Sequence, residues 1–284
     1  MANRPTLLIR SLACAVPALV FAGPLSAAVL FDTNGFETSG TPETYASGNL
    51  VGQNGWGSFA GQNSLAVDNN RTITGGLSVR SLSGSQTAAR EISVTPDLAG
   101  TDFIIAGTIG NDTNDDTGAA NVAITTGTGG FDLLRLRRDG GNEQFQAFAA
   151  NSSGVDTAGD TLAADDAVSA GVPNFAYEYE ITLRYNPGTN DDQARVLVRE
   201  IGGTTWTAIS AVAGATLDSE DFADLGYDAD SGTLYVALQA NNPDFRSSVR
   251  FDDLVVSTAV IPEPASLALL SAGGLCLLGR RRRA

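Results

Sequence analysis

The sequence predicts an all-β fold, a two-layer antiparallel β-sandwich, over residues 29–259. Three observations support this prediction. Apolar and polar residues alternate with a period of two along many short segments, which is typical of strands with one buried face. Residues that favour turns recur about every dozen positions, as they do in sandwiches. Neither a sustained helical periodicity nor a strand–helix–strand alternation is visible. The flanking segments, residues 1–28 and 260–284, each predict a helix instead.

The N-terminal segment has the order of a secretory signal peptide. Arg4 and Arg10 precede an apolar run over residues 12–22, and Ala27 and Ala28 follow among small residues. Signal peptidase cleaves at small-x-small sequences of this kind. We therefore predict a signal helix that signal peptidase removes next to Ala27 and Ala28 during export. A helix buried in the folded domain is the alternative interpretation of the same apolar run.

The clearest strands form a hairpin in the middle of the chain. In FAYEYEITLRYN, tyrosine, isoleucine and leucine alternate with Glu178, Glu180 and other polar residues. The turn-rich connector NPGTNDDQ leads to ARVLVREI, where Arg195 and Arg199 alternate with apolar residues. Because cross-strand neighbours on one face interact, we expect the glutamates to face the arginines across this hairpin.

Further strands are predicted on both sides of this hairpin. FDLLRLRRDGGNEQFQAFAA predicts a second hairpin, since Asp-Gly-Gly-Asn tolerates positive φ in a turn. Single strands are predicted at DFIIAGTI, ANVAITTG, TTWTAIS, GTLYVALQA and SSVRFDDLVVS. Residues 151–174 predict a long excursion between strands, with a helical turn in LAADDAV. A boundary between two small domains in this excursion is the alternative.

Composition excludes several kinds of chemistry. The chain carries a formal net charge of −15, contains no histidine, and has only two cysteines, Cys14 and Cys276, both in the terminal segments. Residues 29–259 therefore lack the residues for a disulfide framework, a cysteine nucleophile, a Cys- or His-ligated metal site or a Ser-His-Asp triad. An acidic protein also repels nucleic acid, so we predict no nucleic-acid partner.

Glycoside hydrolysis would need two suitably placed carboxylates. Glu178 and Glu180 are the only pair that the pattern places on one strand face. Ion pairing with the arginines of the neighbouring strand is the simpler explanation of both, so we predict no catalytic residues. A secreted glycosidase or lyase remains the alternative interpretation.

Two acidic turns are candidate calcium ligands, and calcium is the only cofactor that the sequence suggests. NDTNDDTG contains Asp112, Asn114 and Asp116, and YDADSG contains Asp228 and Asp230. Ca²⁺ is bound by several oxygen ligands from one tight turn. Neither turn has the full spacing of an EF-hand loop, and acidic residues are common in hairpin turns for other reasons.

The C-terminal segment combines three features. Pro262, Glu263 and Pro264 are followed by an apolar stretch over residues 266–279, and the chain closes with a cluster of cations: Arg280, Arg281, Arg282 and Arg283. A helix over this stretch is about 21 Å long, shorter than the ~30 Å hydrocarbon core of a bilayer. Clustered arginines resist crossing the membrane and stay cytoplasmic. This pattern predicts a transmembrane helix that by itself is only a weak anchor.

This ending resembles the PEP-CTERM sorting signal of bacterial surface proteins in order, spacing and position. The resemblance implies that an exosortase, a multi-pass membrane protease, holds the tail and cleaves it near Pro262–Pro264. The flanking prolines favour an extended segment that a protease cleft accepts. An ordinary C-terminal membrane anchor is the alternative interpretation.

The segment FDTNGFETSGTPETYASGNLVGQNGWGSF and the closing VRFDDLVVS resemble the first and last parts of concanavalin A-like, laminin G-like jelly rolls. The resemblance implies a sandwich whose last strand pairs near the first. Such folds serve as carbohydrate binders, glycosidases and structural modules. We predict a non-enzymatic exported protein of the cell surface or extracellular matrix that associates with surface polysaccharide. A purely structural matrix component is a further alternative.

Overall fold

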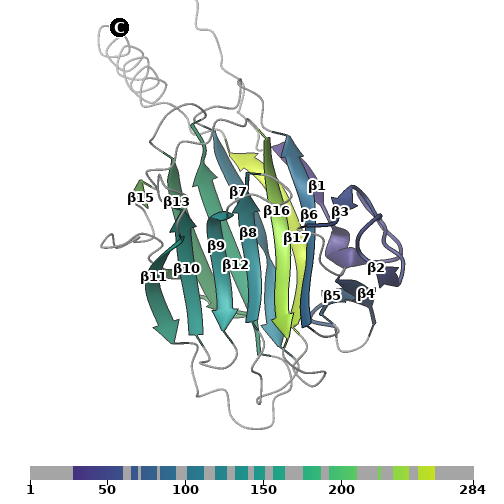
Figure 1. The fold of residues 1–284 in the computed structure, drawn as a ribbon. Helices are drawn as coiled ribbons and strands as arrows, with labels where there is room; N and C mark the ends of the chain where they lie inside the picture. Colours follow the sequence, from purple (N-terminus) through teal and green to yellow (C-terminus); the bar gives the residue numbers. More distant parts are fainter. Residues whose placement is uncertain are drawn as a thin grey trace, which may run out of the picture.

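We describe the protein from a computed structural model. It describes residues 28–59, 65–69, 72–81, 84–93, 101–111, 119–126, 132–139, 144–150, 156–163, 175–186, 192–209, 223–224, 233–242 and 249–259. All paired strands in these ranges are antiparallel, and they form two sheets stacked face to face (Figure 1). The predicted all-β sandwich is therefore confirmed.

The larger sheet has ten strands. Its main path runs through β14 (Thr207–Ile209), β13 (Gln193–Glu200), β12 (Phe175–Arg184), β7 (Asp102–Asn111), β17 (Val249–Ala259), β5 (Ser78–Arg80), β4 (Ala66–Asp68) and β2 (Gly48–Asn49). Two short strands flank this path, β1 (Ala28–Asp32) beside β17 and β15 (Ala223–Asp224) beside β13. The smaller sheet has seven strands, in the order β11 (Asp156–Ala163), β10 (Gln144–Ala150), β9 (Asp132–Asp139), β8 (Ala119–Thr125), β16 (Thr233–Asn242), β6 (Gly84–Ser93) and β3 (Trp56–Gly57).

Both predicted hairpins are confirmed. In β12 and β13, Glu178 lies opposite Arg199 and Thr182 lies opposite Arg195. In β9 and β10, Leu136 lies opposite Ala147. Strands also form at all five single segments that the alternation predicts. The period-two pattern therefore located these strands, and in the β12–β13 hairpin it also assigned the two faces correctly.

Two long strands, β6 and β11, were not predicted, and neither were the short strands β2, β3, β4, β5 and β15. β6 lies between β3 and β16 and pairs with both. β11 is the edge strand of the seven-stranded sheet, and its residues belong to the segment predicted as a long excursion. The sequences GSQTAAREIS and DTAGDTLA contain few large apolar residues, so alternation is hard to see in them. Leu162 and Ala163 of the expected helical turn belong to β11, so the prediction of a loop was wrong for residues 156–163.

The core lies between the sheets and is made of the inward-facing residues of each strand. On β12 these are the tyrosine, isoleucine and leucine side chains of the predicted apolar face, all buried. Each such side chain contributes roughly 1.5–3 kcal/mol through the burial of its apolar surface. Gly107 on β7 lies opposite Tyr179, and a Cβ there would lie 2.6 Å from the tyrosine Oη. Glycine at this position therefore makes room for the tyrosine hydroxyl.

The first and last strands are neighbours. β1 pairs with β17, and Ala28 lies opposite Thr258. This confirms the expectation, drawn from the jelly-roll resemblance, that the closing strand returns to the first. Directly after β1, the short 3₁₀ turn η1 (Asn34–Phe36) packs its phenylalanine into the core.

Among the described residues, no helix is long and apolar enough to cross a bilayer. The predicted signal helix and the predicted C-terminal transmembrane helix lie outside those residues. Both therefore stay predictions.

Candidate functional site

The outer face of the ten-stranded sheet carries a set of ion pairs. Arg199 binds Glu178, and Arg195 Nη2 lies 3.1 Å from Glu180 Oε1. The predicted cross-strand ion pairing of the two glutamates is thus confirmed. A general acid must bring its proton to the glycosidic oxygen of the substrate. Here each glutamate is already bound by a guanidinium on a sheet face, which does not favour that role.

Trp206 lies on the same outer face. It directly precedes β14, one residue beyond the Val198–Thr207 pair, and the Arg199 guanidinium carbon lies 4.3 Å from the centre of its ring. The indole is only partly buried. The alternation in TTWTAIS favours a core position for Trp206, and this expectation is wrong, because its position opposite Arg199 puts it on the outward face of an edge strand.

Between the charged residues lies a floor of small and apolar side chains. Glu180 has Ala106 on one side and Leu197 on the other, and Ala106 in turn lies opposite Val255. We call this surface the Trp206 face, defined by these residues: Ala106, Glu178, Glu180, Arg195, Leu197, Arg199, Trp206 and Val255. It combines an aromatic ring, apolar contact area and paired hydrogen-bonding groups.

On the outer face of the seven-stranded sheet, a phenylalanine covers several small side chains. Phe59 packs over Ala89, Ala123 and Ala237, which are 0–2% exposed. The Phe59 carbonyl accepts a hydrogen bond of 2.9 Å from the Thr87 hydroxyl, which fixes this cover to the sheet. The small side chains therefore serve close packing here.

At the border of that cover, a polar group remains accessible. Arg135 stacks on the Phe148 ring at 4.5 Å and binds Asp132 at 3.0 Å. Gln239 donates a hydrogen bond of 3.2 Å to the same aspartate. Phe148 is therefore a second partly exposed aromatic residue stacked on an arginine, on the opposite side of the molecule from Trp206.

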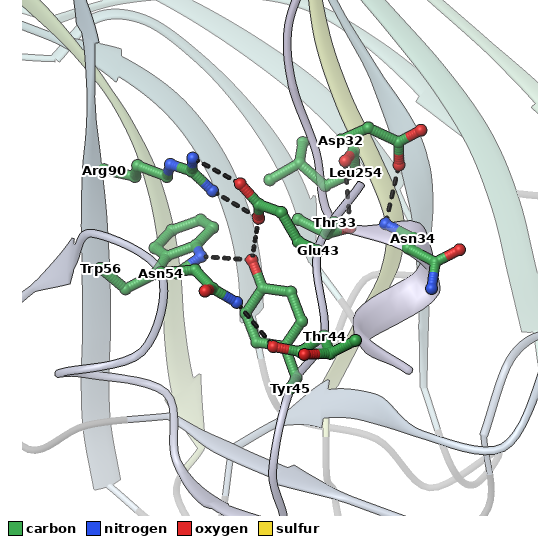
Figure 2. A network of polar contacts seen from close by, with 10 residues as sticks. All are labelled: Asp32, Thr33, Asn34, Glu43, Thr44, Tyr45, Asn54, Trp56, Arg90 and Leu254. Atoms are coloured by element: carbon green, nitrogen blue, oxygen red, sulfur yellow. Dashed lines mark hydrogen bonds and ion pairs between the residues drawn. The ribbon is translucent and has the colours of Figure 1, made fainter. Parts of the chain in front are cut away.

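A third polar network lies at the edge of the sandwich formed by β6 and β3 (Figure 2). The Glu43 carboxylate accepts two hydrogen bonds of 2.7 Å from Arg90 and one of 2.7 Å from the Tyr45 hydroxyl. Trp56 donates a hydrogen bond of 3.2 Å to the Tyr45 oxygen, and Arg90 lies over the Phe31 ring. Burial, with the Glu43 bond, raises the pKa of Tyr45 above its ordinary value. All partners are used within the network, so its role is to hold residues 43–56 on β6.

A group of carboxylates surrounds an irregularity in the last strand. The register of β17 shifts between Asp252 and Val255, and Asp253 has a φ of +49°. The Glu37 carboxylate next to them accepts hydrogen bonds from the backbone amides of residues 76 and 77. Burial is the main cause that raises the pKa of Asp252 from 3.8 to about 7. The sequence predicted a plain strand here and gave no sign of this group.

The predicted calcium ligands lie outside the described residues: Asp112, Asn114, Asp116, Asp228 and Asp230. In the part of the chain that the structure describes, no three His, Cys, Asp or Glu side chains are grouped so that they could hold a metal ion. The sorting residues also lie outside it: Pro262, Glu263, Pro264, Arg280, Arg281, Arg282 and Arg283. Of the two residues predicted at the signal cleavage site, Ala28 is exposed at the start of β1, and Ala27 is not described.

Several solved structures resemble this sandwich at low sequence identity. The CBM2 module of an evolved Dit protein from Lactobacillus casei BL23 phage J-1 is 13% identical, with a TM-score of 0.47 and coverage of 83% of this chain and 98% of that one. Lectin I from Ulex europaeus, solved with the methyl glycoside of α-L-fucose, is 10% identical, with a TM-score of 0.42 and coverage of 71% and 95%. These values are too low to carry a conclusion about ligand or activity. No curated protein matches the chain.

The family comparison identifies the tail. Residues 260–283 match the PEP-CTERM protein-sorting motif, and the match includes the Pro-Glu-Pro triplet, the apolar stretch and the arginine cluster. The motif marks an exported protein that is sorted to the cell surface. The chain thus carries a PEP-CTERM sorting motif at its C-terminus, behind an all-β domain of two antiparallel sheets.

Proposed function

We propose that this is a non-enzymatic protein of the cell surface or extracellular matrix, delivered by transient membrane tethering and removal of its tail. The match of residues 260–283 to the sorting motif carries this proposal. In it, signal peptidase cleaves at Ala27 and Ala28, the arginine cluster stays in the cytoplasm, and an exosortase cleaves near Pro262–Pro264. An apolar helix of about 21 Å holds the chain only until that cleavage.

The test of delivery is the intact mass of the mature protein from its native cell. We expect a mass that lacks both terminal segments. Deleting the exosortase should leave the tail attached and the protein in the membrane fraction. Replacing the four arginines by glutamine should slow processing, since the stop to translocation is lost. Mature protein that still carries residues beyond Pro264 in wild-type cells would contradict this delivery route.

We further propose that the partner is a surface polysaccharide and that the Trp206 face contacts it. Sugar rings present apolar C–H faces that pack on aromatic and apolar side chains, while their hydroxyl groups need hydrogen-bond partners. The Trp206 face offers both, because the indole and the apolar floor adjoin carboxylate–guanidinium pairs. These pairs bring acids and arginines together, which suits a hydroxyl-rich partner better than a strongly anionic one.

The test of this contact uses mature protein and polysaccharide isolated from the producing cells. We expect Trp206→Ala to weaken binding roughly two- to tenfold, the range for loss of one aromatic packing contact. Phe148→Ala is the matched control, since it removes a partly exposed ring stacked on an arginine from the other sheet. Equal losses in both variants would contradict the assignment to the Trp206 face. If the wild-type protein does not bind the polysaccharide, the remaining interpretation is a structural matrix component.

The rival function is a glycosidase or lyase, and the same polysaccharide tests it. We expect the wild-type protein to release no reducing ends. Hydrolysis that is lost in both Glu178→Gln and Glu180→Gln would establish the enzyme and overturn the non-enzymatic proposal.

A further inference from the structure

One hydroxyl group lies between two carboxyl groups at the irregularity of β17. Thr74 Oγ1 lies 2.6 Å from Asp253 Oδ2 and 3.0 Å from Asp252 Oδ2. The Thr74 amide also donates to Asp252 Oδ2 at 3.1 Å, and the Asp253 amide donates to Asp252 Oδ1 at 3.0 Å. These contacts fasten residues 72–76 to the last strand, 178 residues further along the chain. We call this group the Thr74 clasp, defined by Thr74, Asp252 and Asp253.

The hydrogen count of the Thr74 clasp requires an additional proton. A hydroxyl group has one hydrogen and can donate it to only one carboxylate. The distance of 2.6 Å to Asp253 is that of a charge-assisted bond, so the hydroxyl donates there. Its lone pairs then face Asp252 Oδ2 at 3.0 Å, and two lone pairs at that distance repel each other unless Asp252 carries a hydrogen.

We propose that the Thr74 clasp holds one proton on Asp252 and that loss of this proton with rising pH releases residues 72–76 from β17. With the proton in place, every donor has an acceptor. The Thr74 amide donates to Asp252 Oδ2, the Asp252 hydroxyl donates to Thr74 Oγ1, and the Thr74 hydroxyl donates to ionised Asp253. Without it, two carboxylates compete for one hydroxyl hydrogen.

The charged surroundings favour retention of the proton. From the turn after η1, the Glu37 carboxylate adds a negative charge near residues 75–77. On β7, Thr108 lies opposite Asp252 and is neutral. From β12, the Tyr179 hydroxyl lies in the core under this part of the sheet. Of these neighbours, none supplies a positive charge.

The neighbouring cations are directed elsewhere. Arg250 on β17 contacts Asp68 at 3.8 Å and Ser78 at 3.3 Å, and Arg80 on β5 binds Asp68. Asp252 is fully buried, so water does not stabilise its charge. The pKa of about 7 that burial and Asp253 give this carboxyl group agrees with the hydrogen count.

Deprotonation acts on a defined part of the fold. The Gly35 backbone in η1 lies against both carboxyl groups, so a Cβ there would be 3.0 Å from Asp253 Oδ1 and 3.5 Å from Asp252 Oδ1. The clasp therefore joins three segments: η1, residues 72–76 and the middle of β17. We expect a rise in pH to loosen these contacts while the sheets stay paired.

The test combines a titration with hydrogen exchange on the mature protein. The carboxyl carbon of Asp252, followed by NMR in the wild-type protein, should titrate near pH 7. Protection of the Thr74 amide, corrected for intrinsic exchange, should fall about tenfold between pH 7 and pH 8, one unit above the midpoint. In Asp253→Asn the new amide can donate to Thr74 Oγ1, so this pH dependence should disappear. Asp102→Asn, which removes a carboxylate paired with Arg184 on the same sheet, should keep it.

Two results obtained without added Ca²⁺ would overturn the proposal. One is an Asp252 carboxyl group that is ionised at pH 5 in the wild-type protein. The other is amide protection at Thr74 that does not change between pH 6 and pH 8 although Asp252 titrates. Because both are measured on the wild-type protein, a variant that fails to fold does not affect the conclusion. If addition of Ca²⁺ ionises Asp252 at pH 6 and keeps Thr74 protected, a bound cation and not a proton holds the clasp, and the proposal falls.

Discussion

Replacing Glu43 by alanine is the sharpest test of what stabilises the edge of the sandwich at β6 and β3. The variant removes a carboxylate that accepts three hydrogen bonds, two from Arg90 and one from Tyr45. Breaking a buried ion pair costs about 3–5 kcal/mol, because one charge is left without a partner. Both side chains here keep 17% of their surface exposed, so water compensates in part. We therefore expect the free energy of unfolding to fall by about 2–3 kcal/mol.

A double-mutant cycle separates the ion pair from the packing around it. Arg90→Met keeps an unbranched chain over Phe31 but removes the charge. We expect the double variant to be about as stable as the weaker single variant, with a coupling energy of about 1.5–2.5 kcal/mol. Urea unfolding followed by tryptophan fluorescence measures all four proteins, since Trp56 is buried beside the network.

A weak coupling between Glu43 and Arg90 would contradict this explanation of the stability of the network. A coupling energy below about 0.5 kcal/mol is the value of an exposed surface ion pair. That result would mean that apolar packing of Phe31, Tyr45 and Trp56 stabilises this edge and that the carboxylate contributes nothing specific.

Four further variants test other contacts by urea unfolding. Tyr179→Phe should raise the free energy of unfolding by up to about 1 kcal/mol, since its buried hydroxyl has no hydrogen-bond partner among the residues that the structure describes. Gly107→Ala should lower it by about 1–3 kcal/mol, because the added Cβ would lie 2.6 Å from the Tyr179 oxygen. A stable Gly107→Ala protein would contradict that placement. Glu178→Gln should change it by less than about 1 kcal/mol, as expected for a partly exposed ion pair with Arg199. The pKa of Asp252 rises from 3.8 to about 7 on folding, so between pH 4 and pH 7 the folded state holds a proton that the unfolded state has lost. This group should therefore lower the free energy of unfolding as pH rises through that range, by at most about 4 kcal/mol. Asp252→Asn should remove that contribution.

The sequence was most informative where strands carry large apolar residues on one face. β12 and β13 alternate so regularly that the face of each side chain and the ion pairs of Glu178 and Glu180 followed from the pattern. This works because cross-strand neighbours of a hairpin are close in sequence and their register is set locally.

Strands made of small and polar residues were missed for the opposite reason. On β6 the inward positions include Gln86, Ala88 and Arg90, and only Ile92 is large and apolar. The burial of these residues depends on the neighbouring β3 and β16, which no local pattern reveals. The prediction that Trp206 is buried was wrong for a related reason, since an alternating pattern does not tell which face of an edge strand is outward.

The polar clusters depend on long-range contacts. Glu43 and Arg90 are 47 residues apart, and Thr74 and Asp252 are 178 residues apart. Nothing in the letters around Asp252 distinguishes a carboxyl group in a sheet irregularity from an ordinary acidic position on a strand. The topology brings these groups together, so only the fold identifies them.

The pairing of β1 with β17 brings two residues that lie near the two expected cleavage sites, and far apart in the sequence, to one corner of the molecule. Ala28, beside the expected signal cleavage, lies opposite Thr258, only a few residues before the Pro-Glu-Pro triplet. A fluorophore on the newly made N-terminus and another on the tail would thus start within energy-transfer distance and separate when the tail is cut. The loss of energy transfer at this corner would then report, in living cells, the tail removal that we propose.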